Sequence, residues 1–315
     1  MRRVPLDSSR RHIWIILVVV AFLTVDAVLL AAALRPPDLS ARPPHTIPTF
    51  TPTPTDGPSP TAGIITAAVP SNRVLSALDD GTAWRAGTGT CPDTAASPER
   101  STDGGATWVP TDATGTAEVL APQTLWVLDR MTVELVALDE VDCTPQFVKT
   151  FVDGADYARY PAQLATSWYV DPADRSAVHT PAGKMAAPCA AVVSLAAASA
   201  SAGSAALLCA DQTVFLTTDS GKGWSQSVRV IGAVNLGVTQ MGYVIAAVGL
   251  PECAGVQLIA LSVNPTTVTP TGCLPVDEPA ETMQGNVAVA EAAGTLWVWA
   301  GDSVMRSIDQ GTSWQ

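Results

Sequence analysis

The sequence is poor in basic side chains for its length of 315 residues. Lysine and arginine together number 17, against 29 aspartates and glutamates, so the formal net charge is −12 at pH 7. Nucleic acid is therefore not expected as a ligand, because binding a phosphate backbone requires a basic stripe. The acidity instead favours solubility or a cationic partner.

Metal-binding patterns are also missing. None of the six cysteines belongs to a Cys-x-x-Cys pair, and His179 is the only histidine after residue 62. Structural zinc sites combine closely spaced cysteines and histidines, so we expect no metal site and no cofactor. There is also no Asn-x-Ser/Thr acceptor with x other than proline. With the alanine-rich composition, this absence favours a high-GC bacterial envelope protein over a glycosylated animal receptor.

Only one long hydrophobic run is present, over residues 13–34. Its 22 residues are interrupted by Thr24 and Asp26 alone, and a helix of this length can cross a hydrocarbon core of ~30 Å. Residues 1–12 form a basic tail with four arginines and His12, and this bias places the N-terminus in the cytoplasm. We therefore predict a transmembrane signal-anchor helix in the cell membrane, with the C-terminal part extracytoplasmic.

Two questions about this span stay open at the level of sequence. A cleaved signal peptide is the alternative, since Ala31, Ala32 and Ala33 supply small residues. The apolar region of such peptides is usually shorter, at roughly 7–15 residues, which favours the uncleaved anchor. Asp26 is the one ionisable residue in the span, and it faces either a partner or the headgroups near the outer end.

Residues 35–62 are rich in proline, threonine, serine and aspartate, with nine prolines. A proline-rich chain without apolar periodicity stays extended at ~3.1 Å per residue, so we predict a disordered stalk. Its threonines, such as Thr51 and Thr53, carry O-linked sugars or belong to an unmodified spacer. Residues 63–315 then form the extracytoplasmic folded domain, with 11 basic and 25 acidic residues and a net charge of −14.

All six cysteines fall in this domain, which indicates an oxidising compartment and three disulfides. Six cysteines allow 15 pairings, and we predict the sequential one. Two pairs each close a short loop of the size that links neighbouring strands, which leaves the first two cysteines for each other. The predicted pairs are Cys91–Cys143, Cys189–Cys209 and Cys253–Cys273.

One pattern of eight residues, [Ser/Thr]-x-Asp-x-Gly-x-x-Trp, occurs three times in the domain. Its residue types describe a hairpin turn: the aspartate accepts backbone N–H groups, the glycine allows a positive φ, and the hydroxyl bonds the backbone locally. The tryptophan then anchors the returning strand in the core. The three copies contain Ser101, Asp103, Gly105 and Trp108; Thr217, Asp219, Gly221 and Trp224; and Ser307, Asp309, Gly311 and Trp314.

This pattern resembles the Asp box, or bacterial neuraminidase repeat, of sialidase-like β-propellers. The resemblance implies an all-β propeller in which each box lies between the third and fourth strands of a blade, away from the ligand-binding face. It also implies a structural role for the boxes, because each aspartate is committed to its own turn. Relatives of this kind include photosystem assembly factors and sorting-receptor ectodomains, which use the ring as a platform.

The spacing of the boxes predicts six blades. Asp103 and Asp219 are 116 residues apart, and Asp219 and Asp309 are 90 apart, which fits three and two blades of about 40–45 residues each. Boxes then lie in blades one, four and six, with five or seven blades as alternatives. Residues 63–69 are apolar and β-branched, so we expect them to complete the last blade and close the ring. The alanine-rich stretch 190–208 is assigned to strand and loop rather than helix.

The resemblance raises the possibility of an enzyme. A sialidase-like site requires three arginines, a tyrosine nucleophile paired with glutamate, and an acid aspartate. No Arg-Ile-Pro sequence is present, and no partners are evident for the four candidate tyrosines, so we assign no catalytic residue. The candidates are Tyr157, Tyr160, Tyr169 and Tyr243.

We therefore expect a membrane-tethered, non-catalytic binding or assembly module for an envelope protein or a surface glycan. An exo-glycosidase of sialidase-like type is the alternative. Five strand tryptophans either belong to the core, which is the commoner role, or line a sugar-binding mouth. They are Trp84, Trp126, Trp168, Trp297 and Trp299.

Overall fold

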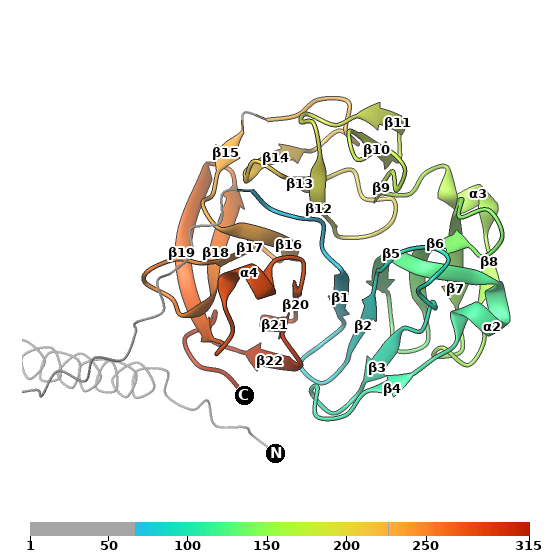
Figure 1. Cartoon of the computed structure of the whole chain (residues 1–315), viewed down its shortest axis with the longest axis horizontal. Helices are drawn as coiled ribbons and strands as arrows, with labels where there is room; N and C mark the ends of the chain where they lie inside the picture. Colours follow the sequence, from blue (N-terminus) through green and yellow to red (C-terminus); the bar gives the residue numbers. More distant parts are fainter. Residues whose placement is uncertain (1–66, 226) are drawn as a thin grey trace, which may run out of the picture. The chain divides into compact units, whose positions relative to one another are not determined.

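The computed structural model describes residues 67–315 with the exception of Gln226. The predicted basic tail, membrane span and stalk in residues 1–62 lie outside the described residues. Among those described, no helix is long and apolar enough to cross a membrane. The described chain folds into six antiparallel sheets arranged as a β-propeller (Figure 1), so the predicted all-β class and blade number are confirmed.

Each blade uses one continuous stretch of chain. Blade one contains β1 (Arg73–Ala77), β2 (Ala83–Gly87), β3 (Glu99–Ser101) and β4 (Val109–Pro110). Blade two contains β5 (Val119–Val127), β6 (Val133–Asp139), β7 (Pro145–Thr150) and β8 (Ala158–Arg159). Blade three contains β9 (Tyr169–Val170), β10 (Ala177–Thr180) and β11 (Gly183–Ala186).

The second half of the ring continues in the same order. Blade four contains β12 (Val192–Ala197), β13 (Ala205–Cys209), β14 (Thr213–Thr217) and β15 (Val228–Arg229). Blade five contains β16 (Ala233–Thr239), β17 (Gly242–Val248), β18 (Gly255–Val263) and β19 (Thr266–Pro275). Blade six contains β20 (Val287–Ala292), β21 (Thr295–Ala300) and β22 (Ser303–Ser307). The short helices α2 (Ala113–Ala117), α3 (Pro161–Leu164) and α4 (Ala280–Met283) lie in connections between blades.

The three octapeptide turns follow β3, β14 and β22, in blades one, four and six as their spacing predicts. Stretch 190–208 forms β12, a loop and most of β13, so its assignment to strand is also confirmed. Alanine has a high helix propensity, but the two strands pair along their length, and tertiary pairing overrides a weak local preference.

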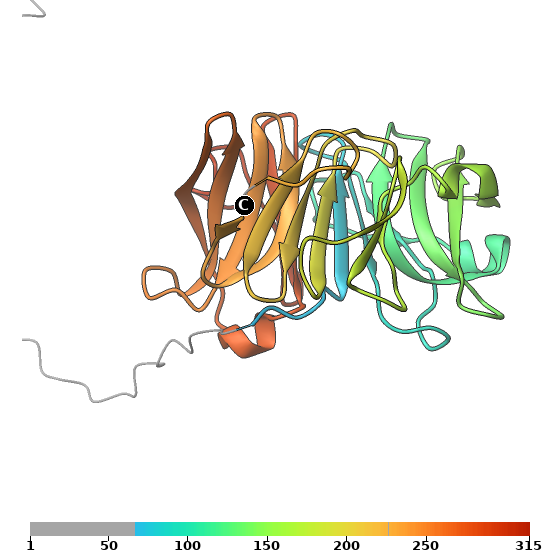
Figure 2. The same cartoon turned by 90° about the horizontal axis from the view of Figure 1, so that it is seen from above.

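The turns of the blades lie on two faces of the ring. Successive connections of an up-and-down antiparallel sheet fall at alternate ends of its strands. In blade one, the β1–β2 hairpin (78–82) and the β3–β4 turn (102–108) therefore share a face, and the Gly104 N–H donates to the Gly81 carbonyl at 2.9 Å. We term this the box face. The opposite face, which carries the β2–β3 loop (88–98), α2 and α4, is the connection face (Figure 2).

The ring closes differently from the sequence-based prediction. We expected residues 63–69 to add the outer strand of blade six, but the Ala68 N–H donates to the Ala210 carbonyl of blade four at 2.8 Å. The outer edge of β22 is already occupied, because Arg306 and Gln315 exchange backbone hydrogen bonds of 2.9 and 3.0 Å. The prediction was therefore wrong for the described residues 67–69, and every described blade is built from contiguous chain.

Small polar side chains on the innermost strands join neighbouring blades. Ser76 Oγ in β1 accepts the Val127 N–H of β5 at 3.1 Å, and Asn235 Oδ1 in β16 accepts the Val289 N–H of β20 at 3.3 Å. The seam between blades six and one is joined by Arg73, whose guanidinium donates to the Asn286 carbonyl at 2.8 Å. The inward-facing polar groups thus hold the ring together.

Blade three is the shortest blade, with strands of two, four and four residues. The Trp126 indole of blade two reaches across to blade four, where it donates to the Ala197 carbonyl at 3.0 Å. Both residues are at most 9% exposed. The tryptophan therefore fills the space that a longer innermost strand occupies in the other blades.

Candidate binding surfaces

The three octapeptide turns are closed by the same set of hydrogen bonds. In blade one, Ser101 Oγ accepts the Gly105 N–H at 2.8 Å and donates to Asp103 Oδ1 at 2.8 Å. Gly105 has a φ of 87°, a left-handed conformation that favours glycine. The equivalent bonds from the Gly221 N–H to Thr217 Oγ1 and from the Gly311 N–H to Ser307 Oγ measure 3.0 and 2.7 Å.

The aspartates of these turns are fully engaged within them. Hydrogen bonds from the Thr107 hydroxyl and backbone lower the pKa of Asp103 to about 2, and the same bonds from Ser313 lower the pKa of Asp309 to about 2. The Gly223 N–H lowers the pKa of Asp219. A carboxylate held ionised by its own turn is unsuited to act as a general acid near neutral pH.

A fourth turn of this kind lies in blade two, and the sequence pattern missed it. Thr150 Oγ1 accepts the Gly154 N–H at 3.0 Å, and Gly154 has a φ of 80°. Tyr157 takes the place of the tryptophan and is 2% exposed. The aspartate position is occupied by Val152, so a search that demands aspartate cannot find the turn. The spacing Thr-x-x-x-Gly-x-x-aromatic was the available signal.

In three of these four turns the glycine packs on a tryptophan of the preceding blade; the exception is Gly311, which packs on Gly272 and Leu258 of blade five. A Cβ placed on Gly105 would lie 3.3 Å from Cζ3 of Trp297 in blade six. A Cβ on Gly154 would lie 2.8 Å from Cη2 of Trp84 in blade one. Because of this close packing, the core of one blade fixes the position of the turn in the next blade.

Four of the five strand tryptophans belong to the core. Trp84, Trp126, Trp168 and Trp297 are at most 7% exposed, which decides against a sugar-binding mouth built from them. Trp299 is half-buried, and its ring lies under two guanidinium groups, those of Arg73 at 4.4 Å and Arg85 at 4.7 Å. Cation–π contacts of this kind stabilise the seam between blades six and one.

A cavity of about 600 Å³ runs through the centre of the ring and is lined by the innermost strands. Its charged lining residues are Arg73, Arg175 and Glu291. Arg73 is bound to carbonyls of blade six, and Arg175 Nε donates to the Val192 carbonyl at 2.6 Å. Burial lowers the pKa of both arginines. The guanidinium groups are thus engaged with main-chain oxygens.

The four candidate tyrosines lie away from this cavity. The Tyr157 hydroxyl bonds Thr111 Oγ1 at 2.8 Å, and Tyr169 stacks on His179 with ring centroids 4.1 Å apart. Burial raises the pKa of Tyr157, Tyr169 and Tyr243 to about 12 in each case. A tyrosine nucleophile requires the opposite shift, because it acts more readily as the phenolate.

The three disulfides have the predicted sequential pairing, Cys91–Cys143, Cys189–Cys209 and Cys253–Cys273. The first joins blades one and two, since Cys91 lies in the β2–β3 loop and Cys143 in the β6–β7 loop. The third lies within blade five. No group of three or more histidine, cysteine, aspartate or glutamate side chains among residues 67–315, Gln226 aside, is arranged to hold a metal ion.

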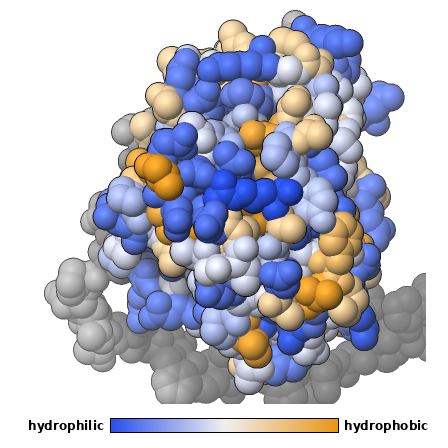
Figure 3. All heavy atoms as spheres, turned by 90° about the vertical axis from the view of Figure 1, so that its right-hand side faces the viewer, coloured by the Kyte–Doolittle hydropathy of each residue, from blue (hydrophilic) through white to orange (hydrophobic). Residues whose placement is uncertain are grey.

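Exposed hydrophobic side chains occur at several places on the described part of the ring. In the side view of the rim that carries blades two and three, most of the surface is hydrophilic and the hydrophobic areas are localised (Figure 3). Twelve large hydrophobic residues in the described chain are exposed. Four of them, Leu128, Met131, Phe151 and Val152, belong to two turns of blade two on the box face.

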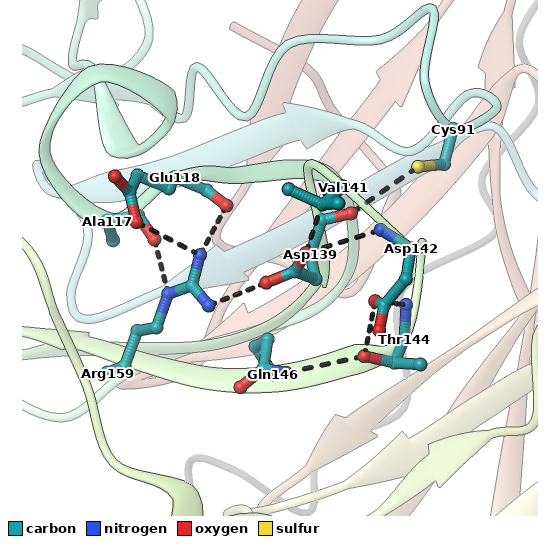
Figure 4. Close-up of polar contacts among 9 residues, drawn as sticks. All are labelled: Cys91, Ala117, Glu118, Asp139, Val141, Asp142, Thr144, Gln146 and Arg159. Atoms are coloured by element: carbon teal, nitrogen blue, oxygen red, sulfur yellow. Dashed lines mark hydrogen bonds and ion pairs between the residues drawn. The ribbon is translucent and has the colours of Figure 1, made fainter.

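The connection face of blade two has a different character. Arg159 lies between Asp139, whose Oδ2 is 2.6 Å from Nη1, and the carbonyls of Ala117 and Glu118, each at 2.6 Å (Figure 4). Asp139 also accepts the Val141 N–H at 2.8 Å. These bonds lower the pKa of Asp139. The cluster fixes the β6–β7 turn that holds the first disulfide, which indicates a structural role.

Comparison with known proteins finds similar solved structures only. No protein-family model matches the chain, and no curated protein matches it. Among solved structures, the chain is similar to "YCF48 bound to D1 peptide", with 19% identity over 80% of this chain and 68% of that one and a TM-score of 0.28. It is also similar to AofleA from Arthrobotrys oligospora, with 9% identity over 80% and 87% of the two chains and a TM-score of 0.46.

A third similar structure is the GH74 xyloglucanase from Xanthomonas campestris, at 15% identity and a TM-score of 0.31. The match covers 77% of this chain, which spans 37% of the length of the xyloglucanase. The class of this protein follows from its own sheets: it is a six-bladed β-propeller.

Proposed function

We propose that the protein is a membrane-tethered, extracytoplasmic propeller of the Asp-box family that serves as a non-catalytic binding or assembly module. Its partner is a protein or a surface glycan of the cell envelope. The hydrophobic run in residues 13–34 and the basic tail in residues 1–12 support the anchor. The three disulfides support an oxidising, extracytoplasmic location for the ring.

The observation that carries the non-catalytic function is the engagement of the groups that could do chemistry. The two arginines of the central cavity bind main-chain carbonyls, and the four tyrosines lie outside the cavity lining. The box aspartates are bound within their own turns. A propeller whose reactive side chains serve its own structure offers a partner shape and surface rather than an activated nucleophile or acid.

Turnover assays on the purified, oxidised full chain test this proposal. The substrates are fluorogenic sialosides and a panel of other fluorogenic glycosides. We expect no turnover from a preparation whose thermal unfolding is cooperative. Cleavage that is abolished by substitution of a single tyrosine or acidic residue would overturn the proposal and establish the sialidase-like alternative.

The binding function has its own test, which is crosslinking in the native envelope with a lysine-reactive reagent. We expect a discrete crosslinked product that contains the full chain and one partner. The absence of any product from correctly localised protein would contradict a binding or assembly module.

A further inference from the structure

Blades one and two have the same backbone framework on the box face. In blade one, Asp79 Oδ1 accepts the N–H groups of Gly81 and Thr82 at 2.9 and 2.6 Å. In blade two, Asp129 Oδ1 accepts those of Met131 and Thr132, each at 2.8 Å. The two β-hairpins therefore correspond residue for residue, with Met131 at the position of Gly81.

The adjoining turns correspond in the same way. The Gly104 N–H donates to the Gly81 carbonyl at 2.9 Å, and the Asp153 N–H donates to the Met131 carbonyl at 3.0 Å. Phe151 thus occupies the position of Thr102, and Val152 that of Asp103. The second bond joins the turn of Met131 to the turn of Phe151 and Val152, so the exposed residues of the two turns lie close together on the box face.

This surface, the blade-two patch, consists of Leu128, Met131, Phe151 and Val152. These residues are 42%, 49%, 51% and 46% exposed. At three of the four positions the fold does not require an apolar residue, because blade one has Gly81, Thr102 and Asp103 where blade two has Met131, Phe151 and Val152. The fourth, Leu128, corresponds to Leu78 of blade one. The Gly81 backbone would also accept a larger residue, since a Cβ there would meet nothing closer than Asp79 Oδ1 at 3.6 Å.

Exposed apolar side chains that a fold does not need indicate a contact surface. Phe151 is already held in place by Tyr160, with ring centroids 6.0 Å apart, and by Lys149, whose Nζ lies 4.7 Å from the centroid of the Phe151 ring. An aromatic side chain held by neighbours loses little conformational entropy when a partner covers it. Phe151 therefore has the character of an interface anchor.

The charges around the patch identify the kind of partner. Asp129 and Asp156 flank it in the same two turns and are exposed, as is Asp80 in the neighbouring hairpin of blade one. One exposed cation, Arg130, faces Asp79 with 3.7 Å between Nη2 and Oδ2. The folded domain carries a net charge of −14, so its field attracts cations and opposes anionic lipid and a second acidic copy.

We infer that the blade-two patch docks an apolar segment of a partner protein whose flanks carry lysine or arginine. This inference rests on the proposed binding function and specifies its site and the chemistry of its partner. The apolar part of the segment covers Met131, Phe151 and Val152, and its cationic flanks face Asp129 and Asp156. Docking therefore uses the box face of the ring, not the connection face.

Binding of two synthetic peptides to the oxidised full chain in nanodiscs of neutral lipid tests the inference. Both peptides have a central Leu-Phe-Leu-Phe segment, flanked by lysines in one and by glutamates in the other. We expect the lysine peptide to bind at least tenfold more tightly than the glutamate peptide, with empty nanodiscs as the blank. Equal binding of the two peptides would overturn the charge component of the inference.

The variant Met131→Gly/Phe151→Thr/Val152→Ser replaces three of the four patch residues with small or polar ones and leaves the turn framework in place. We expect it to lower the affinity for the lysine peptide at least tenfold. The matched control is Met241→Gly/Ile308→Thr, which removes two other apolar residues of the box face that are 80% and 68% exposed. Equal affinity of the patch variant and wild type would contradict the inference, provided that both unfold at the same temperature.

Two further results separate this inference from the proposed function. If the envelope crosslink to a partner forms equally well in the patch variant, the docking site is wrong while the binding function stands. If wild type forms no crosslink at all, the binding function fails. Sedimentation that shows a dimer of wild type and a monomer of the patch variant would overturn the inference in favour of a second copy as the occupant.

Discussion

Blades one and two differ in how they stabilise the same turn. Blade one uses a complete octapeptide, in which Asp103 receives the Thr107 N–H and hydroxyl. Blade two keeps the hydroxyl and the glycine, Thr150 and Gly154, and places a valine at the aspartate position. The comparison shows that the hydroxyl–glycine bond and the packing of the glycine define this turn, while the aspartate adds local hydrogen bonds that another residue can replace.

In blade two, the residue at the position of the turn aspartate does not close the turn. A side chain that no longer closes the turn is exposed, and Val152 joins Phe151 and Met131 in an apolar surface. Blade one shows no such surface, because its corresponding residues are polar or glycine. The loss of the aspartate thus converts a structural turn into a candidate contact surface.

The link between the two blades gives the largest expected effect. Replacing both Cys91 and Cys143 with alanine releases a loop with a sequence separation of 52 residues, and chain entropy predicts a loss of about 4 kcal/mol in unfolding free energy. The corresponding replacement of Cys253 and Cys273, 20 residues apart, is expected to cost about 3 kcal/mol. Urea unfolding of the two variants measures the difference. Equal losses would show that the first bridge does not stabilise the ring through loop closure.

Replacing the turn glycine with alanine is expected to destabilise the protein more in blade two than in blade one. Gly154→Ala forces a side chain into a left-handed conformation and against Trp84 and Thr111, so we expect a loss of about 3 kcal/mol. Gly105→Ala meets its nearest atom at 3.3 Å, and we expect about 1–2 kcal/mol from the backbone strain. Denaturant midpoints of the two variants provide the measurement. A larger loss of stability for Gly105→Ala than for Gly154→Ala would contradict the prediction that the glycine of blade two is the more tightly packed.

Asp103, the turn aspartate of blade one, is expected to make the stability of the fold depend on pH in the acidic range. The folded pKa of Asp103 is about 2, below the ordinary value of 3.8. A lowered pKa stabilises the fold above pH ~4, and this contribution is lost as the pH falls from about 4 to 2. Asp103→Val, which copies blade two, is therefore expected to flatten the decline of unfolding midpoint with pH in that window. A decline that stays as steep as in wild type would show that Asp103 does not contribute to it.

The smallest effect on stability is expected at the surface positions themselves. Val152→Ser and Gly81→Met each alter an exposed or open position without a strained backbone, so the free energy of unfolding is expected to change by about 0.5 kcal/mol or less. Thermal unfolding checks both variants. A loss above about 2 kcal/mol for Val152→Ser would assign the patch to the fold instead of to a partner.

The parts of the structure that the sequence predicted depend on local spacing. The turns after β3, β14 and β22 follow from residue types that act within eight positions, and the two disulfides with short loops follow from strands adjacent in the chain. The six blades follow from the distances between boxes. The turns and the short-loop disulfides are fixed by residues close together in sequence, and the blade number follows from the regular spacing of the turns along the chain.

The features that the sequence did not predict depend on contacts between distant segments. Closure of the ring depends on whether Gln315 or residues 63–69 occupy the edge of β22, and both segments have suitable residues. The span of Trp126 to Ala197 depends on the shortness of blade three. The patch depends on the hydrogen bond that joins the turn of Met131 to the turn of Phe151 and Val152, which forms only when the two turns come together in the folded blade. Exposure of a valine or phenylalanine is a property of the assembled ring.

Site-specific photo-crosslinking in intact cells tests the central claim most directly. A photoreactive amino acid is introduced into the full chain at Phe151 in one variant and at Thr102, the equivalent position of blade one, in the other. We predict that irradiation of the Phe151 variant yields a crosslink to one partner protein with a lysine- or arginine-flanked apolar segment at the site of attachment, and that the Thr102 variant yields none. Equal crosslinking from both positions, or none from Phe151, would contradict the account.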